Sequence, residues 1–210
     1  MTYHSEMISK ETAIKQLGNL FLRGGDVGIS EQYAKSWATA SDLRSRHPNH
    51  SVNQLCQVAT NRYLIQVGSI GALSGAIAAA PYFGTMSTIS STAGDLFVFG
   101  KTSVNHVLLL AALHDLTLDE PQLRRLTVLS ALIGESDSLQ LAGESKRFIE
   151  TLNKKLAEKV AIKVGAKLLP ARLGAALPLF IGAAAGASLN AKLATNISKN
   201  ALGIIKLQAV

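Results

Sequence analysis

The sequence predicts an all-α protein, a single-domain helical bundle with a central pair of Gly/Ala-rich apolar helices or hairpins. Apolar residues recur at helical spacing along most of the chain, and no stretch shows the alternation of a β-strand. Hydrophobic residues make up 48% of the 210 residues, but only 17% are charged and 5% aromatic. Much of the apolar content is small, with 29 Ala and 17 Gly, and the mean hydropathy is +0.23. This composition excludes a disordered chain and a disulfide scaffold, and it leaves open whether the protein sits in water or on a membrane.

Residues 1–50 are expected to form an N-terminal helical extension. A first short helix is predicted over Ser9–Arg23, and the two glycines Gly24 and Gly25 are expected to end it. Ser30 is expected to cap a second helix. The chain does not open with a basic segment followed by an apolar one, so we expect no secretory signal.

Residues 51–210 are expected to form the main all-α domain. Ser51 and Gln54 make a capping-box pattern, which predicts a third helix. The lone cysteine, Cys56, lies on the apolar face of that helix and is expected to be a buried thiol.

Two long apolar segments of this domain carry small residues four positions apart. Small residues at that spacing remove side-chain bulk from one stripe of a helix, so a second helix can approach closely. One hypothesis places these segments in or against a bilayer, and the other makes them the central helices of a soluble bundle. A spanning helix needs about 20 apolar residues, which makes full insertion marginal. The segments are Leu64–Ala80 with Gly71 and Gly75, and Leu173–Ala191 with Gly182 and Gly186.

The remaining elements are predicted from turn residues and caps. Met86–Thr92 is expected to be a turn, and Asp95 to lie at a hairpin tip or cap the apolar helix that follows it. Pro121 is expected at the start of a helix that ends at Gly134. A long amphipathic helix follows, and Pro170 is expected to end it. A last basic helix is predicted from about residue 190 to residue 208.

Positive charge gathers on that long amphipathic helix. The net charge is +7, and residues 121–210 alone hold 13 basic and 5 acidic side chains. A lysine recurs every four residues beside an apolar row of equal spacing, which is typical of a helix on an anionic membrane surface. No aromatic residues interleave with these lysines and no nucleic-acid motif is present, so we expect no nucleic-acid partner. The predicted lipid contacts are Lys155, Lys159, Lys163, Lys167 and Arg172.

Several polar residues in apolar surroundings are candidate buried groups. His106 and His114 would lie roughly 80° apart around one helix, and a metal site would need further ligands from elsewhere. No nucleophile and base stand at a readable spacing. The sequence therefore assigns no catalytic, cofactor-binding or metal-binding residue, and metal-dependent hydrolysis is kept as a minor alternative. The candidate buried polar residues are Asp95, His106, His114, Asp115 and Asn190.

Three blocks of the chain resemble the EcsC family of bacterial helical proteins. The first runs from the Gly/Ala segment through Pro81 to Asp95, and the second is Leu108–Leu116. The third combines Val160–Pro170 with Leu177–Asn190, and the resemblance covers about residues 62–205. It implies a cytoplasmic or membrane-associated helical protein, and no established activity comes with it.

These observations predict a non-enzymatic, membrane-associated helical protein without a cofactor. Its expected partner is anionic lipid of the inner leaflet, with a membrane protein complex as an alternative. The expected location is cytoplasmic, peripheral to the inner membrane or partly inserted in it. A soluble α-bundle that binds an apolar ligand or a partner helix is the main alternative.

Overall fold

The computed structural model describes residues 2–78, 85–137, 139, 145–173 and 179–208, with side chains at 11–70, 94–137, 139, 145–168 and 187–208. These residues form α-helices joined by turns, with no strand among them, so the predicted all-α bundle is confirmed. The helices are α1 (Thr2–Glu31), α2 (Tyr33–Arg46), α3 (Val52–Ala78), α4 (Thr85–Leu113), α5 (Pro121–Ile133), α6 (Lys146–Leu173) and α7 (Leu179–Gln208).

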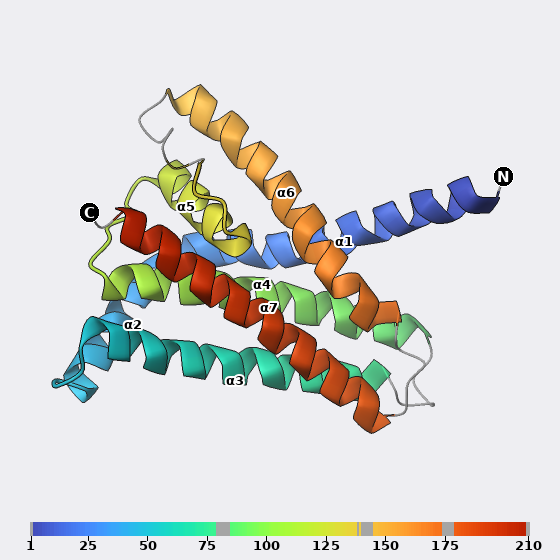
Figure 1. Ribbon diagram of the computed structural model, residues 1–210, viewed down its shortest axis with the longest axis horizontal. Coiled ribbons are helices and arrows are strands. Elements are labelled where there is room, and N and C mark those ends of the chain that lie inside the picture. The colour runs from blue at the N-terminus through green and yellow to red at the C-terminus, as the bar shows by residue number, and fades with distance from the viewer. Residues whose placement is uncertain (1, 79–84, 138, 140–144, 174–178, 209–210) are drawn as a thin grey trace.

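Helix α4 runs through the middle of the bundle, where it contacts α1, α2, α3, α5 and α7, and α7 packs against α3 (Figure 1). Helix α1 contacts both α4 and α6, and α2 packs against α4. The short helix α5 contacts α6 and α7. Most of each Gly/Ala-rich segment lies in α3 or α7, so the two segments belong to neighbouring helices.

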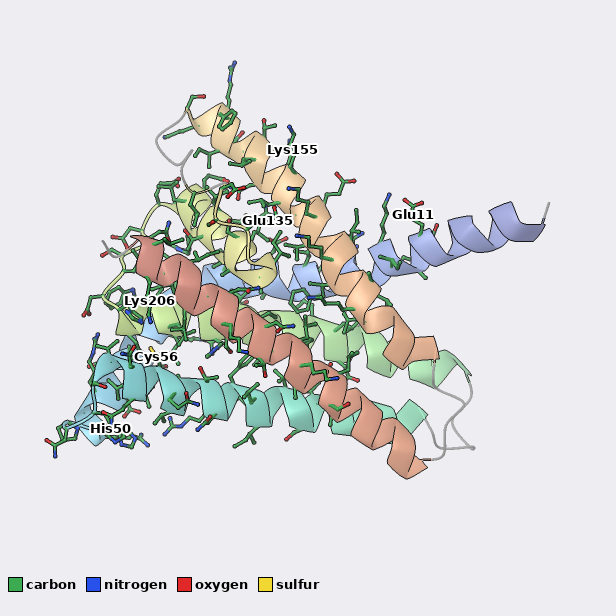
Figure 2. All side chains as sticks on the ribbon, in the orientation of Figure 1. Glu11, His50, Cys56, Glu135, Lys155 and Lys206 are labelled. Carbon is green, nitrogen blue, oxygen red and sulfur yellow. The ribbon has the colours of Figure 1, made fainter. Side chains whose placement is uncertain are left out.

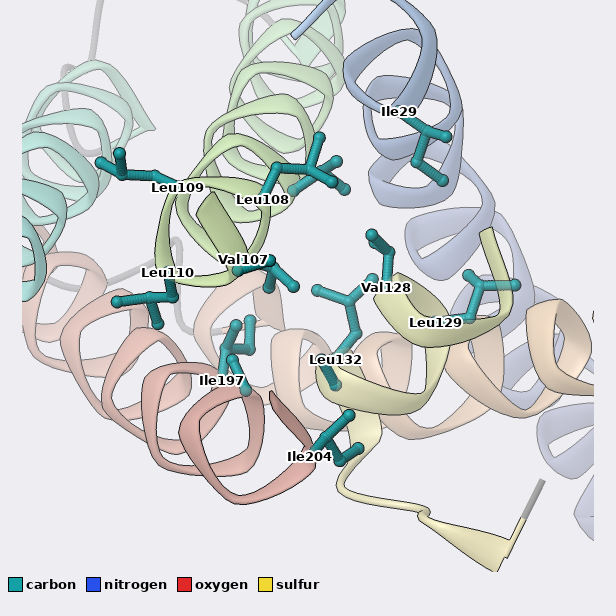
Figure 3. Close-up of a cluster of buried hydrophobic side chains, with 14 of the residues drawn as sticks. Ile29, Val107, Leu108, Leu109, Leu110, Val128, Leu129, Leu132, Ile197 and Ile204 are labelled. Carbon is teal, nitrogen blue, oxygen red and sulfur yellow. The ribbon is translucent and has the colours of Figure 1, made fainter. Parts of the chain in front are cut away.

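One hydrophobic cluster contains buried residues from every helix. Figure 3 shows the part where Val107 of α4, Leu132 of α5 and Ile197 of α7 approach one another. Phe21 of α1 belongs to the same cluster, so core residues lie on both sides of position 50, and the division there stays a prediction. Cys56 is buried as predicted, and burial raises the pKa of its thiol to about 11.

Three helix boundaries follow local signals and confirm the predictions. The backbone N–H of Ser51 donates to Oε1 of Gln54 at 2.8 Å, and the backbone N–H of Gln54 donates to the Ser51 hydroxyl at 3.4 Å. Pro121 occupies the first turn of α5, whose preceding residue Glu120 accepts a hydrogen bond from the helix. Gly134 ends α5 in the left-handed conformation with φ 72°.

Two predicted boundaries near the N-terminus are wrong, because α1 runs without a break from Thr2 to Glu31. Gly24 and Gly25, expected to end a helix, are buried inside it. Ser30, expected to cap the next helix, instead donates its hydroxyl to a carbonyl of its own helix, 3.1 Å away at Val27.

Two further boundaries are also wrong. Helix α4 already includes Met86–Thr92, so Asp95 lies inside a helix rather than at its cap. Helix α6 continues through Pro170 to Leu173. Pro170 removes one backbone hydrogen bond of the last turn, and its fixed φ of about −65° is compatible with the three residues of helix that follow.

The crossing of α1 with α4 explains why glycine is found inside α1. A Cβ built on Gly24 would lie 1.8 Å from the carbonyl oxygen of Phe97, and one on Gly100 would lie 1.9 Å from that of Phe21. Each glycine therefore meets the backbone of the other helix, at a separation that no side chain allows. Glycine costs a helix about 1 kcal/mol relative to alanine, and the close packing of the two backbones offsets this cost.

A second crossing of the same kind joins α1 to α6. A Cβ on Gly18 would lie 1.9 Å from the carbonyl oxygen of Ala161, and one on Gly165 would lie 1.9 Å from that of Ile14. Helix α1 thus uses separate glycines to contact α6 and α4. The two crossings place α6 relative to the core.

We predict that alanine at these crossings destabilises the fold, although alanine ordinarily favours a helix. Gly24→Ala should lower the free energy of unfolding by about 2–3 kcal/mol, because α1 and α4 must move apart. The matched control is Gly203→Ala in α7, where an added Cβ meets nothing within 4 Å. That variant should gain about 0.5–1 kcal/mol. Urea unfolding followed by circular dichroism measures both, and equal changes in the two variants would contradict the close packing.

Candidate functional site

The lysine stripe of α6 lies on the surface of the protein. Its four members Lys155, Lys159, Lys163 and Lys167 are exposed. Figure 2 shows Lys155 on the side of α6 that faces away from the other helices. Arg172, the fifth predicted lipid contact, lies in the last turn of α6, outside the described side chains.

The apolar row beside the stripe holds α6 against the bundle. Helix α6 packs on α1 and α5, and most of the row is buried there. The predicted amphipathic character of this helix is therefore confirmed, and its lysines face outward because the opposite side is in the core. Leu156, Val160, Val164 and Leu168 are buried, and Leu152 is partly buried.

Two large apolar side chains of α6 are partly exposed at the surface and lie outside the buried core. Phe148 and Ile162 are each 41% exposed. They are separated by about four helical turns, so they lie on nearly the same face as Lys155 and Lys159. The sequence analysis missed both, because it assigned the apolar residues of this helix to one buried row. Their spacing relative to the lysines is the signal that could have found them.

Glu135, just after α5, forms ion pairs with two lysines of the stripe. Its Oε2 lies 2.9 Å from Nζ of Lys159, and its Oε1 lies 2.6 Å from Nζ of Lys163. Hydrogen bonds from Lys163 and Lys159 hold the pKa of this carboxyl below its usual range. Within the described part of the chain, Lys155 and Lys167 have no such carboxylate partner. The sequence analysis missed Glu135 because it lies in a different element.

The two predicted glycine pairs lie in helices that pack together. Gly71 and Gly75 are in α3, and Gly182 and Gly186 are in α7. The surroundings of these four glycines lie outside the described side chains, so their role in packing stays a prediction. Among the described residues, the glycines that bring two helix backbones together lie at the crossings of α1 with α4 and α6.

A small polar cluster lies between α3, α4 and α7. The rings of Tyr63 and His106 are stacked, with centroids 4.3 Å apart. His106 Nε2 lies 2.9 Å from the Ser198 hydroxyl, and the Tyr63 hydroxyl lies 2.7 Å from that of Ser103. Each serine donates its proton to a carbonyl of its own helix. A serine that donates to its own helix accepts from its second partner, so Ser103 accepts from Tyr63, and Ser198 accepts from His106 in the tautomer with the proton on Nε2.

This direction of donation distinguishes the cluster from a nucleophile with its base. In such a pair the serine donates its proton to the imidazole, whereas Ser198 donates to the carbonyl of Ala194. Only 3% of His106 is exposed, and burial lowers its pKa to about 3, so its ring is neutral at physiological pH. The arrangement pairs the Tyr63 and serine hydroxyls and Nε2 of His106, whereas Nδ1 of His106 has no hydrogen-bond partner among the described residues. The cluster joins α3, α4 and α7.

The other candidate polar residues lie in different places. Asn190 is buried and donates to the carbonyl oxygen of Val67 at 3.2 Å, which joins α7 to α3. Asp95 is half-buried inside α4, and its Oδ2 has no hydrogen-bond partner among the described residues. Lys101, six residues further along α4, pairs with Glu31 of α1 at 2.6 Å.

His114 and Asp115 form the turn that directly follows α4. Asp115 has φ 56°, a left-handed conformation that Asp tolerates at a helix end. It is exposed, so its prediction as a buried group is wrong, because the turn after α4 lies at the surface. Arg44 of α2 reaches its carboxylate at 2.9 Å and also donates to carbonyls of the last turn of α4. His114 is half-buried, and burial lowers its pKa.

The structure does not bring His106 and His114 together. They lie about 12 Å apart along the axis of α4, one in the core and one at the helix end. Among the described residues no three His, Cys, Asp or Glu side chains are grouped so as to hold a metal ion.

One segment of the described residues, Gly94–Leu113 in α4, is long and apolar enough to cross a membrane. Two-thirds of it (67%) is buried inside the bundle. Core helices of globular proteins have the same length and composition, so this segment is weak support for a membrane span.

Comparisons with protein-family models, with curated proteins and with solved structures give no match to this chain. The resemblance to the EcsC family therefore stays a prediction. The functional proposal below depends on the arrangement of the residues.

We predict that His106 makes stability fall as the pH is lowered. Between pH 6.5 and about 3 the unfolded chain binds a proton that the folded protein excludes, so the free energy of unfolding decreases with falling pH. Below pH 6.5 the free energy of unfolding should fall by up to about 1.4 kcal/mol per pH unit, which is the value for uptake of one proton. Above pH 6.5 this residue should have no such effect.

The variant His106→Gln tests this, because its amide nitrogen can replace Nε2 as the donor to Ser198 but does not titrate. Urea unfolding at pH 7.5, 6 and 5 (about 1 to 1.5 pH units apart) should show a shallower pH dependence of the free energy of unfolding for the variant. Parallel curves for the two proteins would contradict the assignment. The control is His50→Gln at the exposed α2–α3 turn, which should show the same pH dependence of the free energy of unfolding as wild type.

Proposed function

We propose that this chain is a non-enzymatic, membrane-associated helical protein that binds the anionic surface of the inner membrane from the cytoplasm. The observation that carries the proposal is the outer face of α6, where exposed lysines lie beside exposed Phe148 and Ile162. A helix face that combines cations with large apolar side chains is typical of interfacial membrane binding. The resemblance to the EcsC family supports the same class of function.

Charge supplies the selectivity of this surface. A lysine near an anionic membrane contributes about 1 kcal/mol, so the free lysines of the stripe favour acidic over neutral lipid. Lys155 and Lys167 are free in this sense, and Lys154 is a third exposed cation without an ion pair among the described residues. Since exposed charges are screened by salt, the attraction should weaken as ionic strength rises.

The apolar side chains supply the depth of contact. Phe148 and Ile162 are large enough to enter the boundary between headgroups and acyl chains, where part of their exposed surface would leave water. Helix α6 need not leave the bundle to do this, because its other side is already packed on α1 and α5. The surface is therefore preformed, and binding carries no cost of unfolding.

We predict that charge reversal on the outer face of α6 abolishes vesicle binding. The double variant Lys155→Glu/Lys167→Glu should lose most of its flotation with vesicles of phosphatidylcholine and phosphatidylglycerol, by about tenfold or more. The control Lys35→Glu, at an exposed site on α2, should keep most of its binding although it changes charge in the same direction. Flotation of the wild-type protein should decrease as salt is added.

Three results would overturn this proposal. Equal flotation of the wild-type protein with neutral and anionic vesicles would show that charge plays no part in binding. A wild-type protein that does not float at all would exclude lipid as the partner. Retention on duplex DNA without retention on vesicles would assign the basic face to nucleic acid instead.

A further inference from the structure

We propose that Glu135 is a built-in counterion that limits the affinity of the lysine stripe for anionic membranes. This inference rests on the proposed function and concerns the regulation of the same surface. Glu135 binds Lys159 and Lys163, and so withholds two of the four stripe lysines from an external anion. A phosphate group of a lipid would have to compete with the carboxylate for them.

The position of Glu135 is set by the end of α5. Gly134 adopts the left-handed conformation, and the backbone N–H groups of Gly134 and Glu135 both donate to the carbonyl oxygen of Ser130, at 2.8 and 3.1 Å. A Cβ on Gly134 would lie 2.8 Å from the side chain of Asn200, so this turn is also packed against α7. The carboxylate is therefore presented to α6 by a fixed turn.

The ion pairs are close in distance and accessible to solvent. The side chain of Glu135 is 25% exposed, and those of Lys159 and Lys163 are 57% and 49% exposed. Exposed ion pairs of this kind are weak and exchange partners readily, since water solvates the separated charges well. The same two lysines can therefore turn to a membrane phosphate once the surface is close enough.

The geometry also gives each lysine its own carboxylate oxygen. Lys159 binds Oε2 and Lys163 binds Oε1, so one negative charge holds two positive side chains in place. Removing that charge releases both cations on the face that also carries Phe148 and Ile162. Loss of an acidic residue elsewhere changes the net charge equally but releases no cation on this face.

The variant Glu135→Gln tests the inference, because it keeps the size of the side chain and removes its charge. In the full-length protein it should bind vesicles of phosphatidylcholine and phosphatidylglycerol about fivefold more tightly than wild type, as expected for about one more cation at the surface. The salt dependence of binding should become steeper. Binding to pure phosphatidylcholine should stay as weak as in wild type.

Two control variants separate release of the lysines from a change in net charge. Asp42→Asn removes a carboxylate that pairs with Arg46 on α2 at 2.8 Å, and it should change vesicle binding less than about twofold. The triple variant Glu135→Gln/Lys159→Gln/Lys163→Gln should show no gain over wild type. Circular dichroism of each variant establishes that it is folded.

The outcomes distinguish the two proposals. If the wild-type protein binds anionic vesicles and Glu135→Gln binds no more tightly, the counterion role is wrong and the proposed function stands. An equal gain for Asp42→Asn would also overturn the counterion role, because net charge alone would explain it. If neither wild type nor Glu135→Gln binds, both proposals are wrong.

Discussion

The rest of the structure depends on the contacts that α1 makes through glycine. At each of its two crossings, a glycine of α1 lies against the backbone of a second helix, and a glycine of that helix lies against the backbone of α1. Gly24 and Gly100 join α1 to α4, and Gly18 and Gly165 join it to α6. Because backbones in direct contact leave little freedom, these crossings fix how α6 is placed against the core. The outward direction of the lysine stripe follows from that placement.

Helix α6 thus has two sides with different roles. Its packed side combines the glycine crossing with the buried apolar row, and its outer side combines lysines with Phe148 and Ile162. The charge available on the outer side is then set by Glu135, which the turn at Gly134 presents to the stripe. The buried polar cluster around His106 belongs to a different part of the bundle, where it joins α3, α4 and α7.

Signals within about one helical turn predicted their structures correctly. The capping box at Ser51, the proline at position 121 and the glycine after α5 all mark real helix ends, because each depends on residues at most four positions away. Gly24 misled the same reasoning. Glycine both ends helices and allows them to touch, and only the partner helix decides between these uses. Asp95 was likewise misassigned as a cap, since the first turns of α4, which precede it, have little of the usual apolar pattern of a helix.

The sequence by itself determined that the chain is helical, that α6 has a basic face and an apolar face, and that its positive charge lies in the C-terminal part. These properties arise from residue spacing along single helices, which is a local matter. The tertiary structure decided which glycines bring helices together and that Asp115 ends a helix in contact with Arg44. It also decided which lysines of the stripe are paired with a carboxylate, because Glu135 and its two partners are 24 and 28 positions apart in the chain. Such pairings depend on how the helices pack, and no local pattern of residues specifies that packing.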